Sequence, residues 1–212
     1  MMFKRYILSV ALALSLLQGN AQEVFVANSM SERESAPLVL QLHTNGLYWL
    51  AAVPNVGAEI QTDWGISLLV DYMGAWWNKR SSDRFYSCYG FQTEVRYYPD
   101  ALENYAPYRG HHFGIYGQLL TYDFEFGGTG YQSARFGRTW GIGLSYGYLL
   151  PISRKWSLDF SIGIGYLRSG YDKYVPNVWG NYSKVSDGTW TWIGPTSLSV
   201  SFVWNINNEN GK

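Results

Sequence analysis

The stretch Trp156-Ser-Leu-Asp-Phe-Ser-Ile-Gly-Ile-Gly-Tyr166 decides the fold of this chain, because two different surfaces alternate along it with a period of two. Large apolar residues occupy every even position, with an aromatic residue at each end, and small or polar residues occupy the odd positions. Successive residues of a strand point to opposite faces, so one face suits hydrocarbon. The other face lacks the lysine and glutamate coating of a water-facing sheet. This pattern predicts a transmembrane β-strand.

The same alternation recurs along most of the chain. It is found in residues 56–61, 64–76, 85–97, 111–126, 140–148, 156–166 and 190–204, and an even strand number requires one more strand, for which 38–48 is the candidate. We therefore predict an all-β fold, an antiparallel transmembrane β-barrel of eight strands over residues 38–206, followed by a C-terminal tail at 207–212.

Two places break the regular pattern. Asn45-Gly46 fits a tight hairpin and Pro54-Asn55 another turn, so the boundary between the first two strands stays open. In 111–126 the apolar residues change phase, and a β-bulge near Gly117 would reconcile the two halves.

Aromatic spacing provides a check on the membrane interpretation. Trp64 and Trp76 are 12 residues apart, and Trp156 and Tyr166 are 10 apart. At about 3.3 Å per residue and a tilt near 45°, these separations correspond to roughly 23 to 28 Å. That range matches the apolar band of outer-membrane barrels, about 25 Å tall.

The N-terminus has the features of a signal peptide over residues 1–21. Lys4 and Arg5 precede an apolar core at 6–17, and Gly19-Asn20-Ala21 is a small-residue cleavage site. Residues 22–37 are polar and are expected to form a flexible periplasmic lead. Neither the apolar core nor any later stretch is long enough for a transmembrane helix.

Charge and composition exclude several classes of protein. Loss of Lys4 and Arg5 leaves 14 of 16 basic residues against 16 acidic ones, a net charge of −2 that argues against nucleic-acid binding. Cys88 is the one cysteine, so no disulfide forms within the chain. A content of 18% aromatic residues and 23 glycines, with only 15% charged residues, is typical of small outer-membrane barrels.

The connections predict the orientation in the membrane. Shorter connections at 62–63, 99–109 and 153–155 alternate with longer ones at 78–84, 127–138 and 175–188. Because such barrels have short periplasmic turns, we expect a bacterial outer-membrane location with both termini periplasmic. The longer loops carry a net charge of +4, from Lys79, Arg80, Arg84, Arg135, Arg138 and Lys184 against Asp83 and Asp187. Those charges would contact outer-membrane lipid or a surface partner, or simply be solvated.

A soluble β-sandwich or barrel with the apolar face turned inward is the alternative fold. Its outer face would then be almost uncharged glycine and serine, and its interior would have to hold an aromatic residue at both ends of most strands. We favour the membrane fold for that reason.

Eight short motifs follow one another along the chain: Leu42-His-Thr-Asn-Gly-Leu-Tyr48, Pro54-Asn-Val-Gly-Ala-Glu59, Gly74-Ala-Trp-Trp77, Glu94-Val-Arg-Tyr-Tyr98, Gly141-Ile-Gly-Leu-Ser-Tyr-Gly147, Ile162-Gly-Ile-Gly-Tyr166, Tyr171-Asp-Lys-Tyr174 and Gly194-Pro-Thr196. In this order they resemble a Bacteroidota family of small exported proteins of unknown function with an outer-membrane β-barrel appearance. His43 and Gly46 depart from the family's Lys-Thr-Asn-Leu-Leu-Tyr motif. The resemblance implies a barrel and a gene neighbourhood with fimbria-type genes, and it supplies no activity.

Five charged residues are predicted to point into the lumen: Glu59, Asp71, Glu94, Arg96 and Asp159. They would form either a cation-selective path or an ion-pair network that fills the barrel, and we favour the filled lumen because eight strands leave room only for side chains. Acids outnumber bases in this set, so Arg168 or a histidine is expected to join it.

Evidence for an enzyme is weak. His111-His112 is the one histidine pair, and an acyl transferase or hydrolase acting on lipid would need a serine and an orienting group beside one of them. Adjacent strand residues face opposite sides, so at most one histidine serves any one site. No spacing predicts a metal or cofactor site. The sequence favours a structural or interaction protein over a small-solute pore or an enzyme, and the family resemblance implies a role as an accessory to a surface appendage.

Overall fold

The computed structural model describes residues 39–62, 64–79, 84–102, 108–126, 128–176 and 182–206. The strands are β1 (Val39–Asn45), β2 (Asn55–Gln61), β3 (Ile66–Lys79), β4 (Arg84–Tyr97), β5 (Gly110–Phe126), β6 (Thr129–Ser133), β7 (Thr139–Pro151), β8 (Trp156–Pro176) and β9 (Tyr182–Asn205). A short helix, α2 (Gly46–Leu50), follows β1, and a 3-10 turn, η3 (Pro99–Leu102), follows β4. The signal peptide, the lead and the C-terminal tail expected from the sequence lie outside the described residues.

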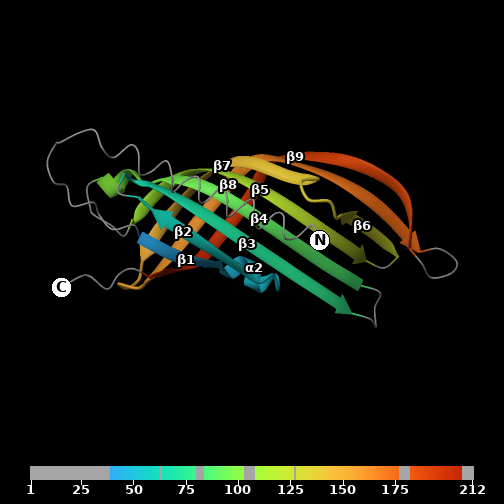
Figure 1. Ribbon diagram of the computed structural model, residues 1–212, viewed down its shortest axis with the longest axis horizontal. Helices are drawn as coiled ribbons and strands as arrows, with labels where there is room; N and C mark the ends of the chain where they lie inside the picture. Colours follow the sequence, from blue (N-terminus) through green and yellow to red (C-terminus); the bar gives the residue numbers. More distant parts are fainter. Residues whose placement is uncertain are drawn as a thin grey trace, which may run out of the picture. The chain divides into compact units, whose positions relative to one another are not determined.

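The sheet is antiparallel, and its hydrogen bonds close a ring through eight strands (Figure 1). The ring runs β1–β2–β3–β4–β5–β7–β8–β9 and returns to β1 through the pairing of Gln41 with Asn205 and Asn45 with Ser201. The all-β, antiparallel prediction and the count of eight ring strands are therefore confirmed. No helix among the described residues is long and apolar enough to cross a membrane.

The two faces of the ring follow the predicted alternation. In the first part of β8, Ser157, Asp159 and Gly163 are buried inside the ring. Phe160, Ile162 and Ile164 are exposed outside it. The glycines of the inner face make room for one large side chain, because Tyr116 of β5 packs against Gly143 of β7 and Gly163 of β8. A Cβ atom at Gly163 would lie 2.7 Å from the Tyr116 ring.

The first two strands are joined differently from the prediction. Asn45-Gly46 is not a tight hairpin: β1 ends at Asn45, whose side chain caps α2, and β2 begins only at Asn55. A polar side chain that accepts a hydrogen bond from a backbone N–H two residues later favours the start of a helix over a two-residue turn. The expected strand at 38–48 is thus β1 followed by α2.

The irregularity is on β9 and not near Gly117. β5 pairs without interruption from Gly110 to Phe126. The even-numbered aromatic residues Tyr122 and Phe124 therefore share the inner face with Tyr116. On β9 the register shifts where Gly163 pairs with Ser197 and Ile164 with Pro195, and a second shift lies where Lys173 pairs with Ser186 and Tyr174 with Lys184. A period-two pattern cannot distinguish a bulge from aromatics that face inward.

This β9 bulge reverses the orientation expected for two tryptophans. Trp190 pairs with Ser169, and Trp192 pairs with Leu167. Ser169 and Leu167 belong to the inner face, where Ser169 hydrogen-bonds Thr139 and Leu167 approaches Gly141. Trp190 and Trp192 are therefore in phase with the interior, and only the residues from Leu198 to Trp204 keep the predicted outward phase.

The three segments expected to be long loops contain strand residues. Residues 127–138 contain β6, which pairs with β5 and β8, and β8 and β9 pair as far as Pro176 with Tyr182. β3 and β4 likewise pair out to Lys79 with Arg84. The connections at the opposite end, 62–65 and 152–155, are short as predicted. Strands β1 and β2 stop well before the end that carries β6 (Figure 1).

Candidate functional site

Four of the five predicted lumen residues meet inside the ring. Glu59 comes from β2, Glu94 and Arg96 from β4, and Asp159 from β8, and none of them is more than 2% exposed. Glu94 and Arg96 share a face because they are two residues apart in a strand. The fifth residue, Asp71 of β3, lies beside this group but makes no ion pair within 4 Å with any described residue.

Arg96 is the centre of the group. Its Nη1 lies 2.9 Å from Asp159 Oδ2 and 3.3 Å from Glu59 Oε2, and its Nε lies 3.2 Å from Glu94 Oε1. A guanidinium group carries five N–H donors in a planar fork, so it can serve three carboxylates at once. Lysine, with one ammonium nitrogen, could not reach the same oxygens in these directions.

Two histidines complete the group, which we call the charge cluster: His43, Glu59, Glu94, Arg96, His112 and Asp159. His43 Nε2 of β1 lies 3.0 Å from Glu59 Oε2, and His112 Nε2 of β5 lies 2.8 Å from Asp159 Oδ1. The excess of acids in the sequence predicts Arg168 or a histidine in this role. Two histidines fill it, and Arg168 is exposed.

Hydroxyl groups satisfy the remaining carboxylate oxygens. Ser67 Oγ donates to Glu59 Oε1 at 2.5 Å, Tyr98 Oη donates to the same oxygen at 3.0 Å, and Ser145 Oγ donates to Glu94 Oε1 at 2.5 Å. Buried carboxylates are tolerated when charges and hydrogen bonds surround them in this way. Sequence reasoning missed these partners because serine and tyrosine inside a strand carry no distinctive pattern.

The charge cluster crosses the interior from wall to wall. With Ser67 and Ser145 included, seven of the eight ring strands supply a side chain to it. A layer of side-chain amides lies on the side of the charge cluster where β1 starts and β9 finishes. There, Gln61 Nε2 donates to Gln41 Oε1 at 2.9 Å, and Gln41 Nε2 donates to Asn205 Oδ1 at 2.5 Å. Tyr98, Tyr108, Leu149 and Val203 form the buried apolar group of this end. The described side chains leave this cross-section filled.

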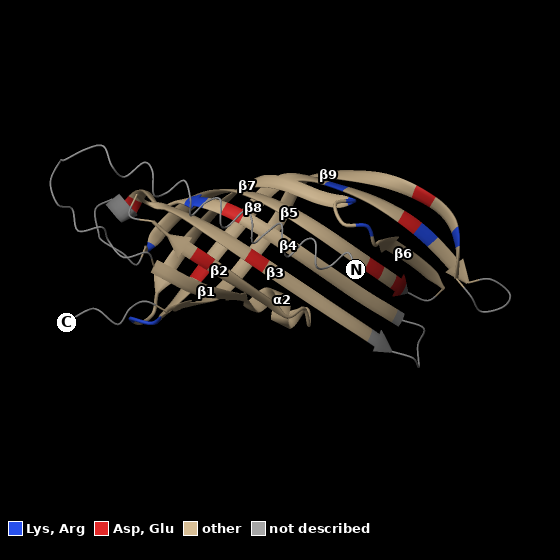
Figure 2. Cartoon of the chain, viewed as in Figure 1, with Lys and Arg blue, Asp and Glu red and all other residues tan. Residues whose placement is uncertain are grey.

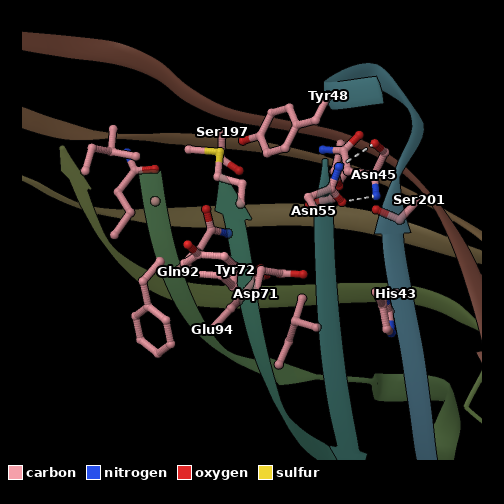
Figure 3. Close-up of a pocket in the computed structure, with 18 of the residues that line it drawn as sticks. His43, Asn45, Tyr48, Asn55, Asp71, Tyr72, Gln92, Glu94, Ser197 and Ser201 are labelled. Atoms are coloured by element: carbon pink, nitrogen blue, oxygen red, sulfur yellow. Dashed lines mark hydrogen bonds between the residues drawn. The ribbon is translucent and has the colours of Figure 1, made fainter. Parts of the chain in front are cut away.

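A polar cavity lies on the other side of the charge cluster, toward α2. Its volume is about 50 Å³, and its wall includes Asp71, Gln92 and Ser199. Tyr48 projects from α2 at one end of the cavity (Figure 3). Beside it, the Asn55 side-chain amide accepts a hydrogen bond from the Asn45 backbone N–H and donates one to the Asn45 backbone carbonyl. Asp71 therefore faces the cavity, which Glu94 and Arg96 also line, whereas Glu59 and Asp159 lie within the charge cluster.

The histidine pair is split between the two faces, as predicted. His111 is exposed outside, where its Nδ1 lies 2.8 Å from Tyr146 Oη, and His112 is buried in the charge cluster. Among the described residues, neither imidazole hydrogen-bonds a serine hydroxyl. The described His, Cys, Asp and Glu side chains also contain no group of three placed to hold a metal ion.

The end of the sheet with β6 carries a second set of ion pairs. Arg138 Nη1 lies 2.6 Å from Asp172 Oδ2, and Lys184 Nζ lies 2.7 Å from Asp172 Oδ1 and 3.3 Å from Asp187 Oδ1. Hydrogen bonds from Arg138 and Lys184 hold the pKa of Asp172 well below its usual range. Arg138 and Lys184, two of the six cations that give the predicted long loops their net positive charge, are thus paired with acids. Charged residues are sparse along the rest of the ribbon (Figure 2).

Comparison with known proteins identifies a family and no activity. Residues 10–206 match the model of the DUF3575 family, described as a protein of unknown function. The chain therefore belongs to the DUF3575 family, which agrees with the unknown-function family that its motifs resemble. No curated protein matches the chain, and no solved structure matches it.

Proposed function

We propose that this protein is an eight-stranded outer-membrane β-barrel with a filled lumen, and that it acts as a structural or interaction component, an accessory to a surface appendage. The observation that carries the proposal is the belt of exposed apolar side chains around a closed ring. On β7, for example, Ile142 is 53% exposed and Leu144 is 65% exposed. A patch of this kind on a closed sheet marks a surface that contacts lipid or protein.

The outward positions of β7 and β8 support a bilayer over a protein partner. From Trp140 to Tyr148 and from Trp156 to Tyr166 they are apolar or aromatic throughout, with an aromatic residue at each end. Aromatic residues at both edges of an apolar band are typical of barrels whose ends lie at the two lipid interfaces.

A pair of arginine substitutions tests membrane insertion. Leu144 lies in the middle of the proposed belt, and Phe136, 73% exposed, lies outside it between β6 and β7. If the belt faces lipid, Leu144→Arg destabilises the folded protein in bilayers by about 2–4 kcal/mol, whereas Phe136→Arg has little effect. Urea unfolding in lipid vesicles, read by the mobility shift between folded and heated samples, measures both. Equal, small effects together with a fully soluble wild-type protein would refute the membrane proposal.

The filled interior favours a structural role over a small-solute pore. The charge cluster and the amide layer beneath it occupy the cross-section with buried side chains. We therefore expect no resolved single-channel steps in planar bilayers at moderate voltage. Steps that Glu94→Gln alters in size would make the pore the better proposal.

The interaction role draws on the implied fimbria-type gene neighbourhood and on exposed aromatic side chains at the β6 end. Tyr131 is 40% exposed and Trp192 is 50% exposed. Cross-linking in native membranes and co-purification test this role, with Trp192→Ala compared against Trp204→Ala at the opposite end. A surface-appendage protein captured by wild type and Trp204→Ala but lost with Trp192→Ala is expected. Failure of all three to capture such a protein counts against the accessory role.

A further inference from the structure

The polar cavity holds a carboxylate, that of Asp71, which forms no ion pair or hydrogen bond with a described residue. It lies between the charge cluster and α2, and its volume of about 50 Å³ has room for a few water molecules. Figure 3 shows Asp71, Gln92 and Glu94 projecting from β3 and β4 toward this space, with His43 at its edge.

Asp71 faces the cavity without a partner. No hydrogen bond or ion pair connects its carboxylate to a described residue, although it lies directly against Gly57 of β2. Glu94, the other acid of the wall, is already bound by Arg96 and Ser145. Asp71 is half-buried, and a carboxylate that loses contact with water without gaining a partner is destabilising unless a counter-charge or a proton compensates it.

His43 supplies a second unpartnered group at the same cavity. The residue is 3% exposed, its Nε2 faces Glu59, and its Nδ1 has no hydrogen-bond partner. The serine hydroxyls of Ser161 and Ser199, which pair across β8 and β9, also line the cavity. The wall is therefore rich in oxygen atoms that can accept hydrogen bonds or coordinate a cation.

The net charge of the interior has one sign in every protonation state of the histidines. Three carboxylates and one guanidinium give the charge cluster −2, and two imidazoles add between 0 and +2. An ionised Asp71 adds −1, so the total lies between −3 and −1. The cavity consequently attracts positive charge.

We propose that this cavity binds one small monovalent cation, an alkali metal ion or a primary ammonium group, with Asp71 as its counter-charge and neutral oxygens of Gln92, Ser161 and Ser199 as further ligands. Oxygen ligands and a single free carboxylate suit a hard monovalent ion better than a divalent metal. The cavity volume limits the occupant to a few heavy atoms. This binding site goes beyond the structural role and does not depend on it.

The test measures binding and stability in the folded full-length chain, kept in detergent micelles or in buffer, whichever keeps it folded. Equilibrium dialysis with radioactive sodium and rubidium should give one ion per wild-type chain and none for Asp71→Asn. Competition with methylammonium distinguishes the ammonium source from the alkali ions. Choline, which is too large for the cavity, should not compete.

Stability provides the second readout. At constant ionic strength, the wild-type unfolding midpoint should rise and saturate when sodium, potassium or methylammonium replaces choline, because a ligand that binds only the folded state stabilises it. Asp71→Asn should remove this dependence and stay folded. Asp123→Asn, an acid outside the cavity, should keep it. Absence of bound ion together with a wild-type midpoint that is independent of the cation overturns the proposal and assigns Asp71 a proton instead.

Discussion

At the scale of the residue, Arg96 accounts for most of the organisation of the interior. It is 2% exposed and contacts three carboxylates that arrive from β2, β4 and β8. Removing one partner of a buried ion pair is far more damaging than replacing the whole set, because the remaining charges are left uncompensated.

Arg96→Met is therefore predicted to destabilise the folded protein by about 3–5 kcal/mol. Methionine fills much of the arginine's volume, so the change isolates the charge from the packing. Urea unfolding followed by tryptophan fluorescence measures the effect, and Arg168→Met, an exposed arginine on β8, is the matched control. Similar losses for both variants would show that Arg96 is not the centre of the interior network.

Strand alternation predicted which charged residues face inward, and it could not predict which of them touch. Glu59 and Asp159 are 100 positions apart in the chain and share Arg96 only because β2 and β8 curve round one ring. Asp71 has the same inward phase and faces the cavity instead. The excess of acids predicted that Arg168 or a histidine joins the cluster, but it did not single out His43, because a single histidine in a strand gives no signal of its partner.

At the scale of the element, α2 closes a part of the wall where two strands are missing. β1 ends at Asn45 and β2 begins at Asn55, whereas the neighbouring strands β9 and β3 continue beyond these two points. The Asn45 side chain accepts from Val200 N–H and donates to Leu198 O on β9, and Trp77 Nε1 of β3 donates to Ala52 O after the helix. These contacts satisfy backbone groups that a sheet edge would otherwise leave unpaired.

Asn45→Ala is predicted to destabilise the protein by about 1–3 kcal/mol, because it leaves groups of β9 and the first turn of α2 without partners. Leu50→Ala, on the same helix and 86% exposed, should have little effect. Urea midpoints measured under one condition compare the two variants. An Asn45→Ala protein as stable as the Leu50→Ala protein would mean that α2 does not hold the β9 edge.

A second element-scale prediction concerns the ion pairs at the β6 end, which lies outside the proposed membrane-spanning region. The folded-state pKa of Asp172 is lowered, so its pairing with Arg138 contributes stability above the unfolded pKa of about 3.9. That contribution is lost as the pH falls through the lower folded pKa.

A spin label at Ala134→Cys, in a Cys88→Ser background, reports this loss. Its mobility should stay constant from neutral pH to about pH 4 and increase below. Asp172→Asn should increase the mobility at neutral pH, and Asp187→Asn, an acid that is 66% exposed, should not. If the label's mobility responds neither to pH nor to Asp172→Asn, the ion pair of Asp172 with Arg138 does not hold the segment between β6 and β7 in place.

At the scale of the whole molecule, the proposed barrel has a defined orientation. The short connections at 62–65 and 152–155 lie at the end where β1 starts and β9 finishes, and β6 lies at the other end. If the short turns are periplasmic, the β6 end faces outward from the cell.

Cysteine labelling in the Cys88→Ser background tests this orientation. A membrane-impermeant maleimide should label Ala134→Cys in intact cells and Ser153→Cys only after the outer membrane is permeabilised. Both positions are exposed, so a difference reports location and not burial. The opposite order of labelling would reverse the orientation, and immediate labelling of both would contradict membrane insertion.

The sequence by itself determined most of the ring strands and their two faces, because alternation depends on residues two positions apart in the chain. The count of eight followed from the even number of strands that a barrel of this kind needs. Only the tertiary structure decided the rest. The bulge lies on β9 and a helix fills the wall beside β1, since several local conformations share one apolar pattern. The partners of Arg96 and the isolation of Asp71 depend on distances across the ring, which no local pattern encodes.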